Sequence, residues 1–112
     1  MNQSVRRVLV AERRTKPRII CDYSAVVKGY DEQGLKFIEK ARVLNLSQSG
    51  IFLVTNRSIR PETEVYVKIA LPTGSLEWGT SKLLTSGIVT RNEFQSDGSV
   101  GIAIKFQHYK FL

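Results

Sequence analysis

The chain has little of the chemistry on which most enzymes and metalloproteins depend. It contains one cysteine, Cys21, and one histidine, His108. A single cysteine excludes an internal disulfide and a multi-cysteine metal site, and a single histidine argues against zinc chemistry. No two of the 10 carboxylates stand out as an acid and base pair, and Ser47 has no histidine near it in sequence. We therefore expect no enzymatic activity, no catalytic residues, no metal and no cofactor.

Long hydrophobic runs are also missing. No stretch approaches the roughly 18 apolar residues that a membrane-spanning helix needs. The first 11 residues are too short and too weakly apolar for a secretion signal. A cytoplasmic protein is therefore expected. Its 112 residues, 42% hydrophobic and 24% charged, are typical of one folded domain.

Acidic residues are the minority charge. The chain has 17 lysines and arginines against 10 acids, which gives a net charge of +7. Between Arg6 and Arg18 there are six basic residues and one acid, Glu12. Such a stretch is often only a solvated surface, but it is also typical of an arm that meets a phosphate-bearing partner. Charge alone does not distinguish a nucleic acid, a lipid surface and a nucleotide.

Beyond Arg18 the hydrophobic pattern has the period of two that is typical of half-buried strands. Turn sequences such as Asp31–Gly34 and Gln95–Gly98 separate the runs. Strands are predicted at residues 19–27, 35–46, 51–55, 65–71, 83–91 and 100–106. They predict an all-β fold, a six-stranded antiparallel barrel, because closure removes exposed strand edges. We expect the barrel domain to span residues 12–112, preceded by a flexible or partly helical N-terminal arm over residues 1–11.

Two motifs flank the first predicted hairpin. The first is Arg14-x-x-x-Arg18. A guanidinium binds phosphate with two hydrogen bonds, stacks on a base, or donates twice to the O6 and N7 edge of guanine. In a chain this rich in arginine, one pair at this spacing is expected about once by chance. The arginine pair is therefore informative only in combination with other features.

The second motif is Asn45-x-Ser47-x-x-Gly50. Chance would give it on the order of 0.05 times in a chain of this composition. One interpretation is structural, because Asn and Ser bond local backbone in turns and Gly accepts a positive φ. The functional interpretation is that Asn45 pairs with a base edge, Ser47 donates to a phosphate, and Gly50 lets a ligand approach the backbone.

Taken together, the two motifs resemble those of the PilZ domain, a bacterial receptor family for cyclic di-GMP. The family signatures are Arg-x-x-x-Arg and Asp/Asn-x-Ser-x-x-Gly, in this order, with a hairpin between them. The strings Gly87–Arg91 and Val100–Phe106 also look like the last two strands of the family. The resemblance runs from about Glu12 to Phe106, and it implies a six-stranded barrel with a ligand-binding N-terminal arm.

The resemblance also implies roles for individual residues. Arg14 and Arg18 would hold guanine and phosphate groups, and the second motif would line the barrel face below them. Arg13 stands where the family often has an arginine that favours two stacked, intercalated ligand molecules. Arg91, on a late strand, could reach the same face. Asn45 replaces the Asp of many members, and an amide lacks the charge that strengthens hydrogen bonds from guanine. The implied ligand-binding residues are thus Arg13, Arg14, Arg18, Asn45, Ser47 and Gly50.

Three functions follow. The leading one is a cyclic di-GMP receptor that changes conformation on ligand binding and signals to a downstream protein, with a homodimer left open. A basic barrel that binds single-stranded nucleic acid is less favoured. Its sites interleave aromatic and basic residues on the surface, whereas aromatics here are scattered over Tyr23, Phe37, Phe52, Phe94 and Phe106. The third is a protein-interaction module of the same fold that has lost ligand binding.

Overall fold

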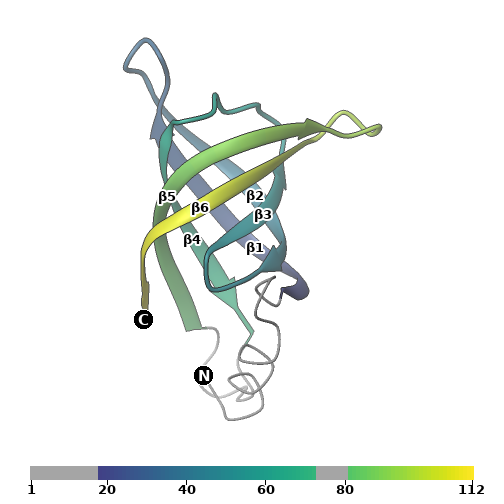
Figure 1. The fold of residues 1–112 in the computed structure, drawn as a ribbon, viewed down its shortest axis with the longest axis vertical. Coiled ribbons are helices and arrows are strands. Elements are labelled where there is room, and N and C mark those ends of the chain that lie inside the picture. The colour runs from purple at the N-terminus through teal and green to yellow at the C-terminus, as the bar shows by residue number, and fades with distance from the viewer. Residues whose placement is uncertain (1–17, 73–80) are drawn as a thin grey trace.

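The computed structural model describes residues 18–72 and 81–112 (Figure 1). They form six strands: β1 (Ile19–Tyr30), β2 (Lys36–Leu46), β3 (Gly50–Thr55), β4 (Glu64–Leu71), β5 (Ser81–Phe94) and β6 (Val100–Phe111). Neighbouring strands are antiparallel, and the order β1-β2-β3-β6-β5-β4 closes on itself. The predicted all-β, six-stranded antiparallel barrel is confirmed. The arm expected over residues 1–11 lies outside the described residues.

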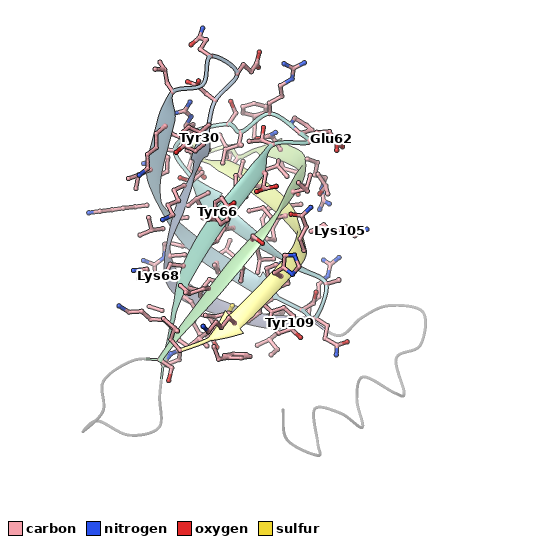
Figure 2. The ribbon with its side chains drawn as sticks, turned by 90° about the vertical axis from the view of Figure 1, so that its left-hand side faces the viewer. Tyr30, Glu62, Tyr66, Lys68, Lys105 and Tyr109 are labelled. Atoms are coloured by element: carbon pink, nitrogen blue, oxygen red, sulfur yellow. The ribbon has the colours of Figure 1, made fainter. Side chains whose placement is uncertain are left out.

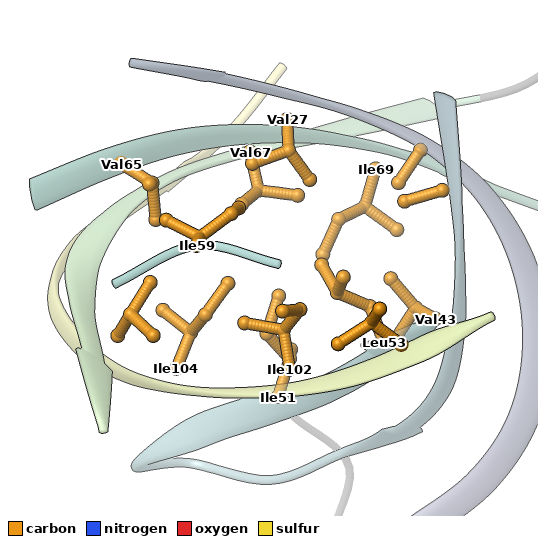
Figure 3. Packing of buried hydrophobic residues seen from close by; sticks show 14 of the residues in the cluster. Val27, Val43, Ile51, Leu53, Ile59, Val65, Val67, Ile69, Ile102 and Ile104 are labelled. Atoms are coloured by element: carbon orange, nitrogen blue, oxygen red, sulfur yellow. The ribbon is translucent and has the colours of Figure 1, made fainter. Parts of the chain in front are cut away.

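Alternate residues of each strand fill the interior of the barrel (Figure 3). Val and Ile dominate, as expected for branched side chains on a pleated surface. Leu53, Ile69 and Ile102 are fully enclosed. Small barrels are filled by their own side chains. A ligand of nucleotide size is therefore expected on the outer surface or at an end. The buried core consists of Ala25, Val27, Phe37, Ala41, Val43, Ile51, Leu53, Ile59, Val65, Val67, Ile69, Leu83, Val89, Val100, Ile102 and Ile104.

The connection between β3 and β4 closes one end of the barrel. Ile59 lies within it and is only 3% exposed. The Asn92 amide holds Ile59 on both sides: its oxygen accepts from the Ile59 N–H at 3.0 Å, and its nitrogen donates to the Ile59 carbonyl at 2.8 Å. Arg57 lies 4.5 Å above the centre of the Phe37 ring at the same end. Because β3 runs from Gly50 to Thr55, the turn between β2 and β3 lies at the opposite end.

Candidate ligand-binding site

Three chain segments meet at the end of the barrel that carries the β2–β3 turn. In the β1–β2 pair, Ile19 lies opposite Leu46 and Ile20 lies opposite Asn45. Asn45 is also paired with Phe52 of β3. Arg18 directly precedes β1 and is exposed. The closure of the β1–β2 hairpin thus brings Arg18, from the first motif, to the same end of the sheet as the second motif.

Two irregularities in strand pairing decide which way Asn45 points. The β1–β2 register shifts between Ile20 and Tyr23, and the β2–β3 register shifts between Val43 and Asn45. In β2 the side chain of Val43 is buried, so strict alternation would also send Asn45 inward. A bulge reverses the alternation, and it is Leu46 that packs against the core. The Asn45 amide is therefore on the outer face, and it makes no hydrogen bond to another described residue.

Ser47 organises the β2–β3 turn. Its N–H donates to the Gly50 carbonyl at 2.9 Å, and its Oγ accepts from the Ser49 N–H at 3.2 Å. The Ser49 carbonyl in turn accepts from the Phe106 N–H at 2.8 Å, which ties the turn to β6. Ser47 therefore bonds the local backbone of the turn, as the structural interpretation expects. To donate to a phosphate, its hydroxyl would have to leave the 3.3 Å contacts that it makes with Ser49 Oγ and the Gly50 carbonyl.

Gly50 is required by packing and not by its backbone torsion. The expectation that this glycine serves a positive φ is wrong: among the described glycines, only Gly34 and Gly98 have one. Gly50 pairs with Lys105 across the β3–β6 ladder. A Cβ atom at this position would overlap the Ile104 carbonyl oxygen. The absent side chain thus lets the backbone of β3 approach the backbone of β6 closely.

Comparison with family models gives a match to the PilZ domain over residues 12–110. The chain belongs to the PilZ domain family. The matched range includes both motifs. A comparison with curated protein sequences finds no match. PilZ domains are known as cyclic di-GMP receptor modules that act in binding and adaptor roles.

The structure describes only some of the residues that the PilZ motifs predict for ligand binding. Arg18, Asn45, Ser47 and Gly50 gather at one end of this PilZ domain, whereas Arg13 and Arg14 lie outside the described residues. Within residues 18–72 and 81–112, no three His, Cys, Asp or Glu side chains are grouped as metal ligands would be. The same part of the chain contains no helix with the length and apolar character needed to cross a membrane.

Two further residues adjoin the PilZ motif residues and were not predicted from the sequence. Lys105, which is labelled in Figure 2, is exposed. It lies opposite Gly50 in the β3–β6 pair, so it adds a cation beside the motif. The sequence contained a signal for this residue, because Lys105 alternates with the apolar residues of β6 and so belongs to the outer face of the strand. Ile20 is 90% exposed and lies opposite Asn45. Adjacent residues on a strand face opposite sides. The pair Ile19-Ile20 therefore already implied one outward apolar side chain, a surface suited to the flat face of a base.

Arg91 lies on the outer face but at a distance from the motif residues. A rung of paired residues runs from Asn45 through Phe52 and Ala103 to Arg91. Three strand spacings separate its two ends, which is roughly 14 Å. Arg91 Nη2 also contacts Glu93 Oε2 at 3.3 Å. Arg91 is therefore placed at the margin of this surface rather than at its centre.

The charged and sulfur groups next to the bulge do not form a reactive centre. Arg42 binds Asp22 through two contacts of 2.6 Å, and the hydrogen bond from Arg42 lowers the pKa of the Asp22 carboxyl. Partial burial, and next the charge of Asp22, raise the pKa of the Cys21 thiol. Its Sγ donates to the Val43 carbonyl at 3.4 Å and it packs against the core. Cys21 is thus a protonated packing residue.

Proposed function

We propose that this PilZ domain is a cyclic di-GMP receptor that changes conformation on ligand binding and signals to a downstream protein, without catalysis. The observation that carries the proposal is the convergence of Arg18 with Asn45, Ser47 and Gly50 at one end of the barrel. It occurs in a chain that matches the PilZ domain over residues 12–110. We assign the receptor to the cytoplasm. Its single cysteine is free, so the chain has no internal disulfide that would require an oxidising compartment.

The ligand carries two negative charges and two guanines, and the residues offer a partner for each. Guanidinium groups bind phosphate oxygens or the O6 and N7 edge of guanine with paired donors. In this proposal the first motif supplies these groups, and Asn45 accepts from guanine N–H groups. Lys105 adds charge next to Gly50, and Ile20 offers an apolar contact to a base. The binding residues are those inferred from the sequence: Arg13, Arg14, Arg18, Asn45, Ser47 and Gly50.

In this proposal, signalling depends on the position of Arg13 and Arg14, which lie just after the N-terminal arm in the sequence. Residues 12–112 form the domain in this proposal, and residues 1–11 form an arm that precedes it. Binding by Arg13 and Arg14 would hold the N-terminal segment against the outer face and so change the surface offered to a partner. Ordering a segment costs about 2–5 kcal/mol. Because micromolar affinity corresponds to about −8 kcal/mol, the contacts themselves must supply roughly 10–13 kcal/mol.

Isothermal titration calorimetry with cyclic di-GMP tests the proposal. We expect micromolar affinity, with a ratio of one ligand per chain, or two if Arg13 supports a stacked pair. Cyclic di-AMP is the matched control, because it has the same two phosphates but lacks the guanine O6 acceptors. It should bind at least about fivefold more weakly, since a lost bidentate base contact is worth about 1–3 kcal/mol. Equal affinity for the two dinucleotides, or no heat at millimolar ligand with a folded protein, would contradict the proposal.

A further inference from the structure

A groove of about 620 Å³ crosses the outer face of the barrel over β5, β4, β1, β2 and β3. It follows two adjacent rungs of the sheet. In one rung Val26 lies between Lys68 and Lys40, and in the next Ser24 lies beside Arg42. The groove exists because short side chains alternate with long ones. Its floor is Ser24, Val26, Val54 and Ala70, and its rim is Lys40, Arg42, Lys68 and Lys82.

The rim of the groove is positively charged. Asp22 engages Arg42 through two contacts of 2.6 Å and so neutralises it. Lys40, Lys68 and Lys82 form no ion pair with a carboxylate of the described residues. Among the described residues, no carboxylate therefore competes with an anion for these three ammonium groups, which lie along a path that crosses the strands. Strands lie about 4.8 Å apart, so the path from Lys40 on β2 across β1 and β4 to Lys82 on β5 is roughly 14 Å long. This length suits an extended chain of negative charges.

An exposed aromatic ring adjoins the groove. The next rung consists of Tyr66, Lys28 and Ile38. Tyr66 is 46% exposed and stands two residues from Lys68 on β4 (Figure 2). Its hydroxyl donates to Glu64 Oε1 at 2.8 Å, which restrains the ring. The strand register thus places lysines and an aromatic ring together on one face of the barrel. This combination was not visible in the sequence, where the aromatic residues are scattered.

We propose that this groove binds single-stranded nucleic acid, with Lys40, Lys68 and Lys82 contacting phosphates and Tyr66 stacking on a base. Single-strand binding sites combine a basic track with aromatic platforms. Lysine supplies much of phosphate-backbone binding, whereas it is depleted at the cores of protein interfaces. The groove shares no lining residue with the candidate cyclic di-GMP site. The two sites are therefore expected to be independent.

Fluorescence anisotropy with a labelled 12-nucleotide oligothymidylate tests this assignment. We expect binding at 50 mM salt, with log K falling against log salt with a slope of about −2, since each phosphate contact on a single strand contributes about −0.7. The double variant Lys40→Gln/Lys68→Gln should bind about tenfold more weakly, with a slope near −0.7. The matched control, Lys36→Gln/Lys110→Gln, removes two exposed lysines outside the groove and should bind like the wild type.

Substitution of the aromatic residue separates stacking from charge. Tyr66→Leu should weaken oligonucleotide binding about tenfold, as expected for one lost base–aromatic stack. Tyr66→Phe keeps the ring and should retain the affinity. Saturating cyclic di-GMP should not displace the oligonucleotide, and Arg18→Ala should not affect its binding, so the groove is tested whether or not the dinucleotide binds.

Three results would overturn the assignment. The first is no oligonucleotide binding by the wild type at 50 mM salt. The second is an unchanged affinity and salt slope in Lys40→Gln/Lys68→Gln. The third is a 12-residue oligoglutamate that displaces the oligonucleotide at equal concentration, which would identify an acidic polypeptide as the better occupant.

Discussion

Replacement of Gly50 by alanine is expected to lower the free energy of unfolding by about 3 kcal/mol, at the upper end of the range for overpacking. The added Cβ would overlap the Ile104 carbonyl oxygen. Backbone that is held in the β3–β6 ladder cannot move aside as a flexible side chain could. Urea unfolding followed by circular dichroism measures the loss.

Gly98→Ala is the matched control for Gly50→Ala. Gly98 has open space around its Cα but a φ of 90°, so alanine there meets only torsional strain of about 1 kcal/mol. Equal losses in the two variants, or a Gly50→Ala protein as stable as the wild type, would show that close approach of β3 to β6 is not what requires this glycine. If Gly50→Ala loses more unfolding free energy than Gly98→Ala, weak ligand binding by a Gly50 variant reflects damaged packing as well as any lost contact with the ligand.

Arg18→Ala is expected to weaken cyclic di-GMP binding by about 1–3 kcal/mol, or roughly 5- to 150-fold, because it removes a bidentate donor. Arg18 is exposed and forms no ion pair with another described residue. Its loss should therefore change the free energy of unfolding by less than about 0.5 kcal/mol. Calorimetric titration of the variant gives the affinity, and urea unfolding gives the stability. Arg14→Ala should have a similar effect on binding.

Arg60→Ala provides a matched control for Arg18→Ala. Arg60 is also exposed, but it lies in the β3–β4 connection at the other end of the barrel, where it contacts Glu32 at 2.9 Å. The Arg60→Ala variant should bind cyclic di-GMP with the affinity of the wild type. An unchanged affinity in both Arg18→Ala and Arg14→Ala would contradict the binding residues proposed for the first motif.

The fold could be predicted from the sequence because alternation marks each strand directly. In β2, Phe37, Ala41 and Val43 share one phase of the alternation and are buried. The ends of β5 and β6 were predicted too early. These strands continue through Phe94 and Phe111, where exposed side chains no longer alternate between core and solvent and the periodic signal disappears.

The candidate site could be predicted only in part. The motif residues were found from their spacing, but the side of the sheet on which Asn45 lies depends on a bulge that no residue type marks. The packing role of Gly50 depends on β6, which follows more than fifty positions later in the sequence, and pairing at that distance leaves no local signal. The groove is similar, because Lys40 and Lys68 become neighbours of Val26 only through the register of β1 with two other strands.

In the proposed receptor, cyclic di-GMP binds at the end of the barrel where Arg18 meets the second motif. The most direct test is an NMR titration that follows the backbone amides of the labelled protein as cyclic di-GMP is added. We predict saturable shifts centred on Arg13, Arg14, Arg18–Ile20, Asn45–Gly50 and Lys105. The turns Asp31–Leu35 and Gln95–Ser99, at the opposite end, should not respond. Shifts that centre on those turns, or no shifts at millimolar ligand, would contradict binding at this end of the barrel.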